Sequence, residues 1–352
     1  MRSPAASKSE TGNKTTKGSR ASHPDPFIVV AKRAQKQSLI LLHGHGSNGE
    51  KFGLEFLKSH TSMTCGHDGV PMTMADHFPD MKFIFPTAKK RRAKWYNRAT
   101  INQWFDSVPI DEQDGHGVTK EEEEWQLDGL RETRAAIRAI IDGEVANFGA
   151  CNVFIGGLSQ GCAMSLHVLL SHEGITDDAA PLGGFVGMSG WLPYATAIER
   201  ILQGQPPDDE NDEDDDDEDD VLGPSSDAEA DEHDPFASGD DHDNHDIAPT
   251  TQTGNDSVPT RVCNFVRDNM DLPPLNTSDP LCLRTLVFLG HGKSDEKVKM
   301  IKGQKAVQCL RDMGVDVTWK DYDEGHWYKV PEEIDDIVEF LQTRLLDCSS
   351  SA

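Results

Sequence analysis

Gly157-Leu158-Ser159-Gln160-Gly161 is the most informative part of this 352-residue chain, because it lies between two runs of different character. The run before it, residues 152–155, contains β-branched and aromatic side chains that favour a buried strand. The run after it, residues 162–170, is apolar over a length that suits a helix. A serine on a sharp strand-to-helix turn presents its hydroxyl above the sheet, and small neighbours leave room for the turn. Since glycine and serine are also ordinary turn residues, the flanking strand and helix carry most of the weight.

Short apolar runs alternate with helical stretches along the rest of the chain. In the longest helical stretch, Trp125, Leu130, Ile137, Ile141 and Val145 approximate an apolar stripe at helical spacing. This alternation predicts an α/β fold, with a mainly parallel sheet and helices on both faces. The predicted strands are 38–42, 82–85, 152–156, 183–188, 285–289 and 315–320, and the predicted helices are 121–147, 160–171, 296–313 and 331–346.

Composition divides the chain into one folding part and two polar segments. Residues 1–25 are almost free of apolar side chains, so we expect a disordered N-terminal tail. Residues 203–260 are acidic and lack Lys and Arg, so we expect a disordered insert that carries most of the formal charge of −27. Residues 26–202 and 261–347 remain, which suffice for one α/β domain and are too few for two.

The composition also argues against several classes of protein. No apolar run approaches the length of about 18 residues that a membrane span needs. The N-terminus lacks the apolar stretch of a signal peptide, and lipidation signals are missing. Seven scattered cysteines without a Cys-x-x-Cys motif favour a reducing compartment over disulfides or zinc. We therefore expect a cytoplasmic protein.

A serine nucleophile needs a base and a third group that orients the base. In hydrolases built on a parallel sheet, the chain order is Ser, then Asp or Glu, then His. Asp295 and His326 fall in this order, and each follows a predicted strand at the end where open α/β sheets bind ligands. Asp295 also suits the N-cap of the helix predicted over 296–313. His326 alone would be an ordinary loop residue, but with Ser159 and Asp295 it indicates catalysis.

Acyl transfer also needs hydrogen-bond donors that face the developing oxyanion. The loop Gly44-His45-Gly46-Ser47-Asn48-Gly49 follows the strand over 38–42 and is placed to supply one backbone N–H, while Gln160 supplies the other. The same six residues spell Gly-x-Gly-x-x-Gly, a dinucleotide-binding pattern. That interpretation requires an acidic residue about 20 positions on, at the end of a second strand. Asp68 has the spacing but lies in a turn-like context, so the nucleotide interpretation is the weaker one.

The motifs together carry a resemblance to the acyl-protein thioesterase branch of the phospholipase/carboxylesterase family of α/β-hydrolases. They occur in family order and span roughly residues 38–346 apart from the insert. Beside the serine motif they are Leu42-His43-Gly44-His45-Gly46, Phe85-Pro86-Thr87, Gln103-Trp104-Phe105-Asp106, Met188-Ser189-Gly190-Trp191-Leu192-Pro193, His291-Gly292 with Asp295, and Gly325-His326.

The resemblance implies an α/β-hydrolase fold and a division of roles among the site residues. Ser159 would be the nucleophile, Asp295 the orienting acid and His326 the base. The backbone N–H groups of His45 and Gln160 would bind the oxyanion. The family hydrolyses fatty acyl thioesters or esters without a metal or organic cofactor.

Three departures from the family pattern accompany the resemblance. Members usually carry an apolar residue where His45 stands and a glycine where Cys162 stands. A long acidic insert follows Trp191-Leu192-Pro193, in a segment that shapes the acyl-chain channel of the family. We therefore expect Trp191 and Leu192 to contact substrate, and we expect the insert to influence substrate preference.

Two charged segments carry no chemistry of their own. Residues 208–220 are acidic except for Asn211, which is typical of a solvated chain and leaves open a basic partner. The acidic residues do not match the pattern of a calcium-binding loop, and we expect no metal site. The basic run 89–94 is typical of an exposed loop; a nuclear address, a phosphate-binding patch and contact with the acidic insert are the alternatives.

The sequence therefore predicts a serine hydrolase that cleaves acyl thioesters or esters, with S-acylated proteins or lysophospholipids as its substrates. A short-chain carboxylesterase is the alternative enzyme. A hydrolase scaffold used as an acidic interaction module is the non-enzymatic alternative. We expect no nucleic-acid partner and no membrane span.

Overall fold

A computed structural model describes residues 22–65, 69–108, 119–174, 180–207 and 256–350. The N-terminal tail and the acidic run 208–220 lie largely or wholly outside these ranges, so the expectations about them stay predictions. Two boundaries differ from the sequence interpretation. His23, assigned to the tail, hydrogen-bonds through Nδ1 to Thr87 O at 3.3 Å. Residues 258–260, assigned to the insert, form the first turn of a helix, α7, whose N-cap is Ser257.

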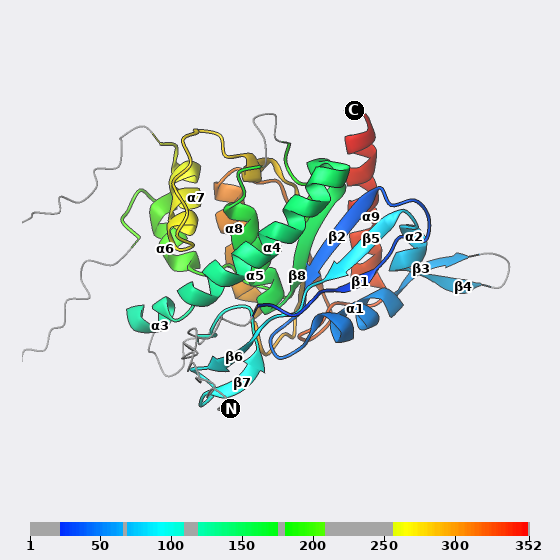
Figure 1. The fold of residues 1–352 in the computed structure, drawn as a ribbon, viewed down its shortest axis with the longest axis horizontal. Helices are drawn as coiled ribbons and strands as arrows, with labels where there is room; N and C mark the ends of the chain where they lie inside the picture. Colours follow the sequence, from blue (N-terminus) through cyan, green and yellow to red (C-terminus); the bar gives the residue numbers. More distant parts are fainter. Residues whose placement is uncertain (1–21, 66–68, 109–118, 175–179, 208–255, 351–352) are drawn as a thin grey trace, which may run out of the picture.

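The predicted α/β fold is confirmed, with seven strands in one sheet (Figure 1). The strand order is β1-β5-β2-β8-β9-β10-β11, and every strand is parallel to its neighbours except β1, which pairs antiparallel with β5. The strands are β1 Phe27–Val29, β2 Gln37–Leu42, β5 Met81–Phe85, β8 Val153–Leu158, β9 Gly184–Met188, β10 Val287–Gly292 and β11 Val317–Tyr322. All six predicted strands are therefore present, within one to three residues of their expected bounds.

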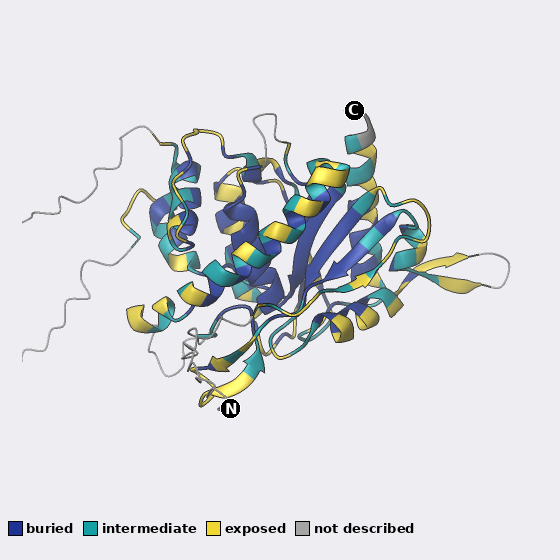
Figure 2. Ribbon diagram, viewed as in Figure 1, coloured by how far each residue is buried: buried dark blue, intermediate teal, exposed yellow. Residues whose placement is uncertain are grey.

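Helices cover both faces of the sheet, and each face has its own apolar core (Figure 2). Successive side chains of β2 point to opposite faces of the sheet. Ile40 and Leu42 therefore pack into one core, and Leu39 and Leu41 pack into the other. Helices α4, α5, α6, α7 and α8 contribute to the first core, and α1, α2 and α9 to the second. The helices are α1 Gly49–Lys58, α2 Met74–His77, α3 Lys120–Glu124, α4 Leu127–Phe148, α5 Gln160–Leu170, α6 Ala195–Leu202, α7 Val258–Asp268, α8 Met300–Asp312 and α9 Glu332–Ser350.

Two predicted helices have different limits in the structure. The helix expected over 121–147 is broken at Trp125 and Gln126, which separate α3 from α4. The helix expected from residue 296 begins only at Met300, with Lys299 as its N-cap. Asp295 therefore does not cap α8, because residues 296–298 form a separate turn.

The basic run expected as an exposed loop is a β-hairpin instead. Strand β6 (Lys90–Ala93) pairs antiparallel with β7 (Ala99–Asn102), and Trp95 and Tyr96 lie in the connecting turn. The side chain of Glu132 fixes the hairpin to α4, since its carboxylate oxygens lie 2.6 Å from both Lys89 Nζ and Arg91 Nη2. A second hairpin, β3 (His60–Cys65) with β4 (Val70–Thr73), projects at the opposite end of the molecule (Figure 1).

No helix in the described ranges is long and apolar enough to cross a bilayer. All seven cysteines are free thiols, although Cys263 Sγ and Cys282 Sγ approach to 3.7 Å in the first core.

Candidate active site

Ser159 occupies the sharp turn between β8 and α5. Its backbone has φ 56° and ψ −124°, a conformation that side-chain-bearing residues rarely adopt and that costs about 1–3 kcal/mol. The turn is held by the Ser159 N–H, which donates to Met188 O at 2.9 Å, and by the Ser159 carbonyl, which accepts from Ala163 N at 3.0 Å. These two hydrogen bonds hold the turn so that the Ser159 hydroxyl points out from the carboxyl end of the sheet.

The glycines on either side of Ser159 are required by close backbone contacts. A Cβ at Gly157 would lie 2.6 Å from Leu42 O, and a Cβ at Gly161 would lie 2.2 Å from the same oxygen. Any larger residue at either position would push α5 away from β2. The Gly-x-Ser-x-Gly pattern is therefore a packing requirement of this turn.

Ser159, His326 and Asp295 form one hydrogen-bonded chain. His326 Nε2 lies 3.0 Å from Ser159 Oγ, and His326 Nδ1 lies 2.8 Å from Asp295 Oδ2 and 3.0 Å from Oδ1. The three residues come from the loops after β8, β10 and β11. An Nδ1–H that donates to the carboxylate leaves Nε2 unprotonated, so that it can accept the serine proton.

The loops that carry Asp295 and His326 are packed against each other. Ser294 N donates to Glu324 O at 3.0 Å. A Cβ at Gly292 would lie 2.1 Å from Gly325 O, so only glycine allows this approach. The spacing between His326 and Asp295 is thus fixed by backbone contacts as well as by their own hydrogen bond.

Asp295 is almost fully buried and has further partners. Its Oδ1 accepts from Lys297 N and Val298 N, both at 2.9 Å, and His291 Nε2 lies 3.4 Å from its Oδ2. Burial acts to raise the pKa of Asp295, but hydrogen bonds from His291, His326 and the Val298 N–H outweigh it and hold the pKa well below its usual range. The carboxylate therefore stays ionised beside His326.

His291 supports the site as a positioning residue, a role that the sequence did not predict. It lies within β10, is buried, and its Nε2–H donates to Val298 O at 2.8 Å. The ring thus supports the turn that wraps around Asp295. In the sequence, His291 belongs to the His291-Gly292 motif that accompanies Asp295.

His45 and Gln160 both line the cavity that contains Ser159. The side chain of Gln160 is fixed by three hydrogen bonds of 3.0 Å, accepting from Trp104 N and donating to Phe105 O and Ser107 Oγ. Gln160 is the first residue of α5, where backbone N–H groups have no acceptor within the helix. Its fixed side chain therefore also fixes this N–H beside the serine.

The loop before His45 is held by a buried, uncharged histidine. His43 Nδ1–H donates to Gly44 O at 2.7 Å, while Nε2 accepts from Ala88 N at 3.0 Å. Burial lowers the pKa of His43 to about 4, which favours the neutral ring that this arrangement needs. Trp104 Nε1 donates to His43 O at 2.7 Å. The Gln103-Trp104-Phe105 segment thus supports both candidate oxyanion residues.

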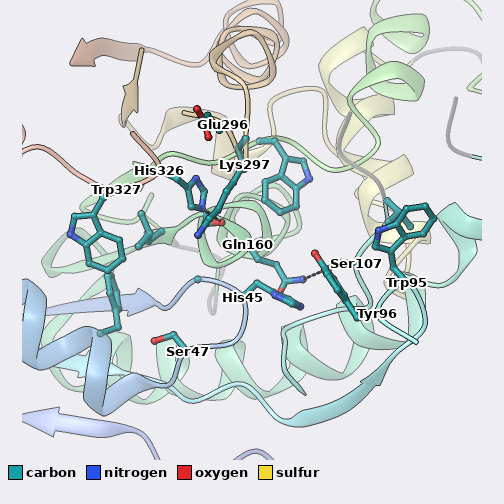
Figure 3. Close-up of a pocket in the computed structure, with 17 residues that line it drawn as sticks. His45, Ser47, Trp95, Tyr96, Ser107, Gln160, Glu296, Lys297, His326 and Trp327 are labelled. Atoms are coloured by element: carbon teal, nitrogen blue, oxygen red, sulfur yellow. Dashed lines mark hydrogen bonds between the residues drawn. The ribbon is translucent and has the colours of Figure 1, made fainter. Parts of the chain in front are cut away.

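A cavity of about 530 Å³ opens above Ser159 (Figure 3). Segments far apart in the chain line it, including Trp95 and Tyr96 of the β6–β7 hairpin, Ser107 and Val108, and Trp327 beside His326. The His45 ring stacks on Tyr96 with centroids 5.2 Å apart, and burial lowers the His45 pKa. The sequence offered no pattern that would bring these aromatic side chains together.

Of the two residues expected to contact substrate, only Trp191 lines the cavity above Ser159. Trp191 lines the cavity above Ser159 and meets Phe105 edge-on at 6.3 Å between ring centroids. Leu192 is 2% exposed and, together with Trp191, lines a smaller neighbouring cavity of about 130 Å³. Trp191 therefore lines both cavities, whereas Leu192 is not among the residues that line the larger one. Within the described ranges, no group of three or more His, Cys, Asp or Glu side chains is arranged to hold a metal ion.

Comparison with known proteins identifies the family of this chain. A family model described as phospholipase/carboxylesterase matches residues 23–206. An acyl-protein thioesterase 1 from Yarrowia lipolytica is 29% identical over 177 residues, which cover 50% of this chain and 66% of the relative. A probable carboxylesterase from Oryza sativa subsp. japonica is 30% identical over 184 residues, which cover 50% of this chain and 57% of the relative. The chain thus spans 57–66% of the length of these curated relatives.

Solved structures share the fold over most of the chain. Acyl-protein thioesterase 2 from Zea mays has a TM-score of 0.53 at 19% identity, covering 91% of this chain and 98% of that one. SOBER1 from Arabidopsis thaliana has a TM-score of 0.51 at 20% identity, covering 88% of this chain and 99% of that one. These likenesses show an α/β-hydrolase fold. Since the family model matches more than half of the sequence, the chain belongs to the phospholipase/carboxylesterase family.

Proposed function

We propose that the protein is a serine hydrolase that cleaves fatty acyl thioesters or esters through a Ser159–His326–Asp295 triad. The observation that carries the proposal is the hydrogen-bonded chain from Ser159 Oγ through His326 to Asp295, at 3.0 Å and 2.8 Å. Curated relatives named as acyl-protein thioesterases and as carboxylesterases support the two bond types.

The reaction follows from the positions of these groups. As Ser159 Oγ attacks the acyl carbonyl, its proton passes to His326 Nε2. Asp295 holds the ring through Nδ1–H and stabilises the imidazolium. Backbone N–H groups of His45 and Gln160 stabilise the oxyanion, and His326 then protonates the leaving thiol or alcohol. Water releases the acid from Ser159 by the reverse sequence, with no metal or organic cofactor.

The cavity favours an apolar acyl chain over a small polar group. Trp95, Tyr96, Trp191 and Trp327 supply large aromatic surfaces around the nucleophile. Each methylene group that is buried against these aromatic side chains stabilises the bound substrate by roughly 0.8 kcal/mol. S-acylated proteins and lysophospholipids present such chains, and we propose them as the substrates. We propose residues 26–202 and 261–347 as the catalytic domain.

A chain-length series tests this function. Thioesters with acyl chains of two to sixteen carbons would be hydrolysed by the full-length protein, with kcat/KM rising beyond eight carbons, and Ser159→Ala would remove turnover. A maximum at two to four carbons would instead assign a short-chain carboxylesterase. If the purified protein hydrolysed none of them and yet bound basic proteins, it would be an interaction module. A variant lacking residues 208–255 tests whether the acidic segment alters the chain-length optimum.

A further inference from the structure

The cavity above Ser159 contains one cationic side chain whose role the reaction does not explain. Among the described residues that line it, Lys297 is the only lysine or arginine. The acidic side chain beside it, Glu296, turns its carboxylate away from the centre of the cavity, whereas Lys297 extends into it past His326 (Figure 3). The cavity therefore receives a positive charge near the nucleophile.

The position of Lys297 is fixed by the catalytic acid itself. Its backbone N–H donates to Asp295 Oδ1 at 2.9 Å. The next residue, Val298, is buried and its N–H donates to the same oxygen. The side chain thus leaves from an anchored turn at the wall of the cavity that contains Ser159 and His326.

The ammonium of Lys297 has no ion-pair or hydrogen-bond partner in the described part of the chain. Two other lysines of this region are paired: Lys293 Nζ lies 2.9 Å from Asp321 Oδ1, and Lys305 Nζ lies 2.8 Å from Glu199 Oε2. A substrate that fills the cavity would displace water from around Lys297, and an anion on that substrate would interact with it more strongly than in bulk water.

We propose that Lys297 determines specificity, and that the preferred substrate carries a carboxylate or phosphate close to the scissile thioester or ester bond. This inference rests on the proposed function of Ser159. A phosphodiester beside the glycerol ester of a lysophospholipid has this chemistry. So does an acidic side chain next to an S-acylated cysteine.

Three octanoyl thioesters with thiol leaving groups of different charge test the proposal. The leaving groups are 3-mercaptopropionate (anionic), 2-mercaptoethanol (neutral) and thiocholine (cationic), and thiol release gives kcat/KM. We expect the wild type to prefer the anionic thioester over the cationic one. Lys297→Met should lower the anionic-to-neutral ratio about three- to tenfold, and Lys297→Glu should invert the preference. The anionic preference of the wild type should shrink as salt is raised.

Lys293→Met is the matched control, because it removes one positive charge from the same loop but outside the cavity. It should leave the ratio as in the wild type. An unchanged ratio in Lys297→Met, or an equal change in Lys293→Met, would overturn the proposal while leaving the triad intact. Failure of the wild type to hydrolyse any thioester would instead overturn the proposed function.

Two further substrates separate the sources of the anion. One is an octanoyl lysophosphatidylglycerol, and the other is an S-octanoylated peptide with aspartate beside the acylated cysteine. Loss of kcat/KM in Lys297→Met with one or both supports the proposal and identifies the carrier. No loss with either would contradict it.

Discussion

Glu333 is a buried acid whose titration makes the stability of the folded protein depend on pH. It lies in the first turn of α9 and is 1% exposed. Its Oε2 accepts from Lys329 N at 2.9 Å, while its Oε1 has no partner and lies 2.1 Å from where a Cβ on Gly290 would be. Burial raises the pKa of Glu333 to about 8 despite the Lys329 N–H, and the charges of Asp336 and Glu324 act in the same direction.

The sign and size of the effect follow from proton linkage. The unfolded chain releases this proton near pH 4.5, whereas the folded protein keeps it until about pH 8. Within that window the folded state binds more protons, so the free energy of unfolding falls as pH rises, by about 1.4 kcal/mol per unit. Between about pH 5 and pH 8 the loss reaches roughly 3–4 kcal/mol. Glu333→Gln keeps the shape and the Lys329 contact but cannot titrate.

Denaturant unfolding of the wild type and Glu333→Gln across this pH range measures the effect. The difference between them should change by about 3 kcal/mol in favour of the variant as pH rises from about 5 to about 8. Buried histidines are common to both proteins and cancel in the difference. Glu332→Gln, an exposed neighbour, is the control and should run parallel to the wild type. Parallel curves for Glu333→Gln would refute the reasoning.

Two other substitutions test the site and the sheet. Asp295→Asn should lower kcat about 10⁴-fold, because the amide favours the wrong tautomer of His326; a loss under about tenfold in steady-state assays would contradict its role as orienting acid. Gly156→Ala should lower stability by at least 3 kcal/mol in thermal unfolding, since the added Cβ would lie 1.8 Å from Val186 O within the sheet. An unchanged melting temperature would contradict that packing.

The sheet was predictable from the sequence because its strands are buried on both faces. Strands β2 and β8 are buried at nearly every position and contain apolar runs, so their bounds could be predicted to within one or two residues. Strand β10 extends to Gly292 because the backbone of Gly290-His291-Gly292 pairs with β11, a contact that apolar patterning does not reveal. The β6–β7 hairpin was missed because a lysine and arginine run resembles a solvated loop, although Glu132 neutralises two of its charges.

The triad residues were predictable because the chemistry restricts their types, order and positions at strand ends. The cavity was not, because its walls come from segments that meet only in the folded protein. Trp95 and Tyr96 reach it from the hairpin turn, and Lys297 from the turn around Asp295. Trp191 and Leu192 are adjacent in sequence, yet only Trp191 lines the cavity above Ser159, while both line the smaller cavity beside it.

Covalent labelling is the most direct test of whether Ser159 is the nucleophile. A fluorophosphonate probe should modify the folded protein at one residue, and peptide mass spectrometry should map the adduct to Ser159. Ser159→Ala should not be labelled, and denaturing the wild type before adding the probe should abolish its labelling, because activation depends on His326. An adduct on another serine, or labelling that persists in Ser159→Ala, would contradict the account.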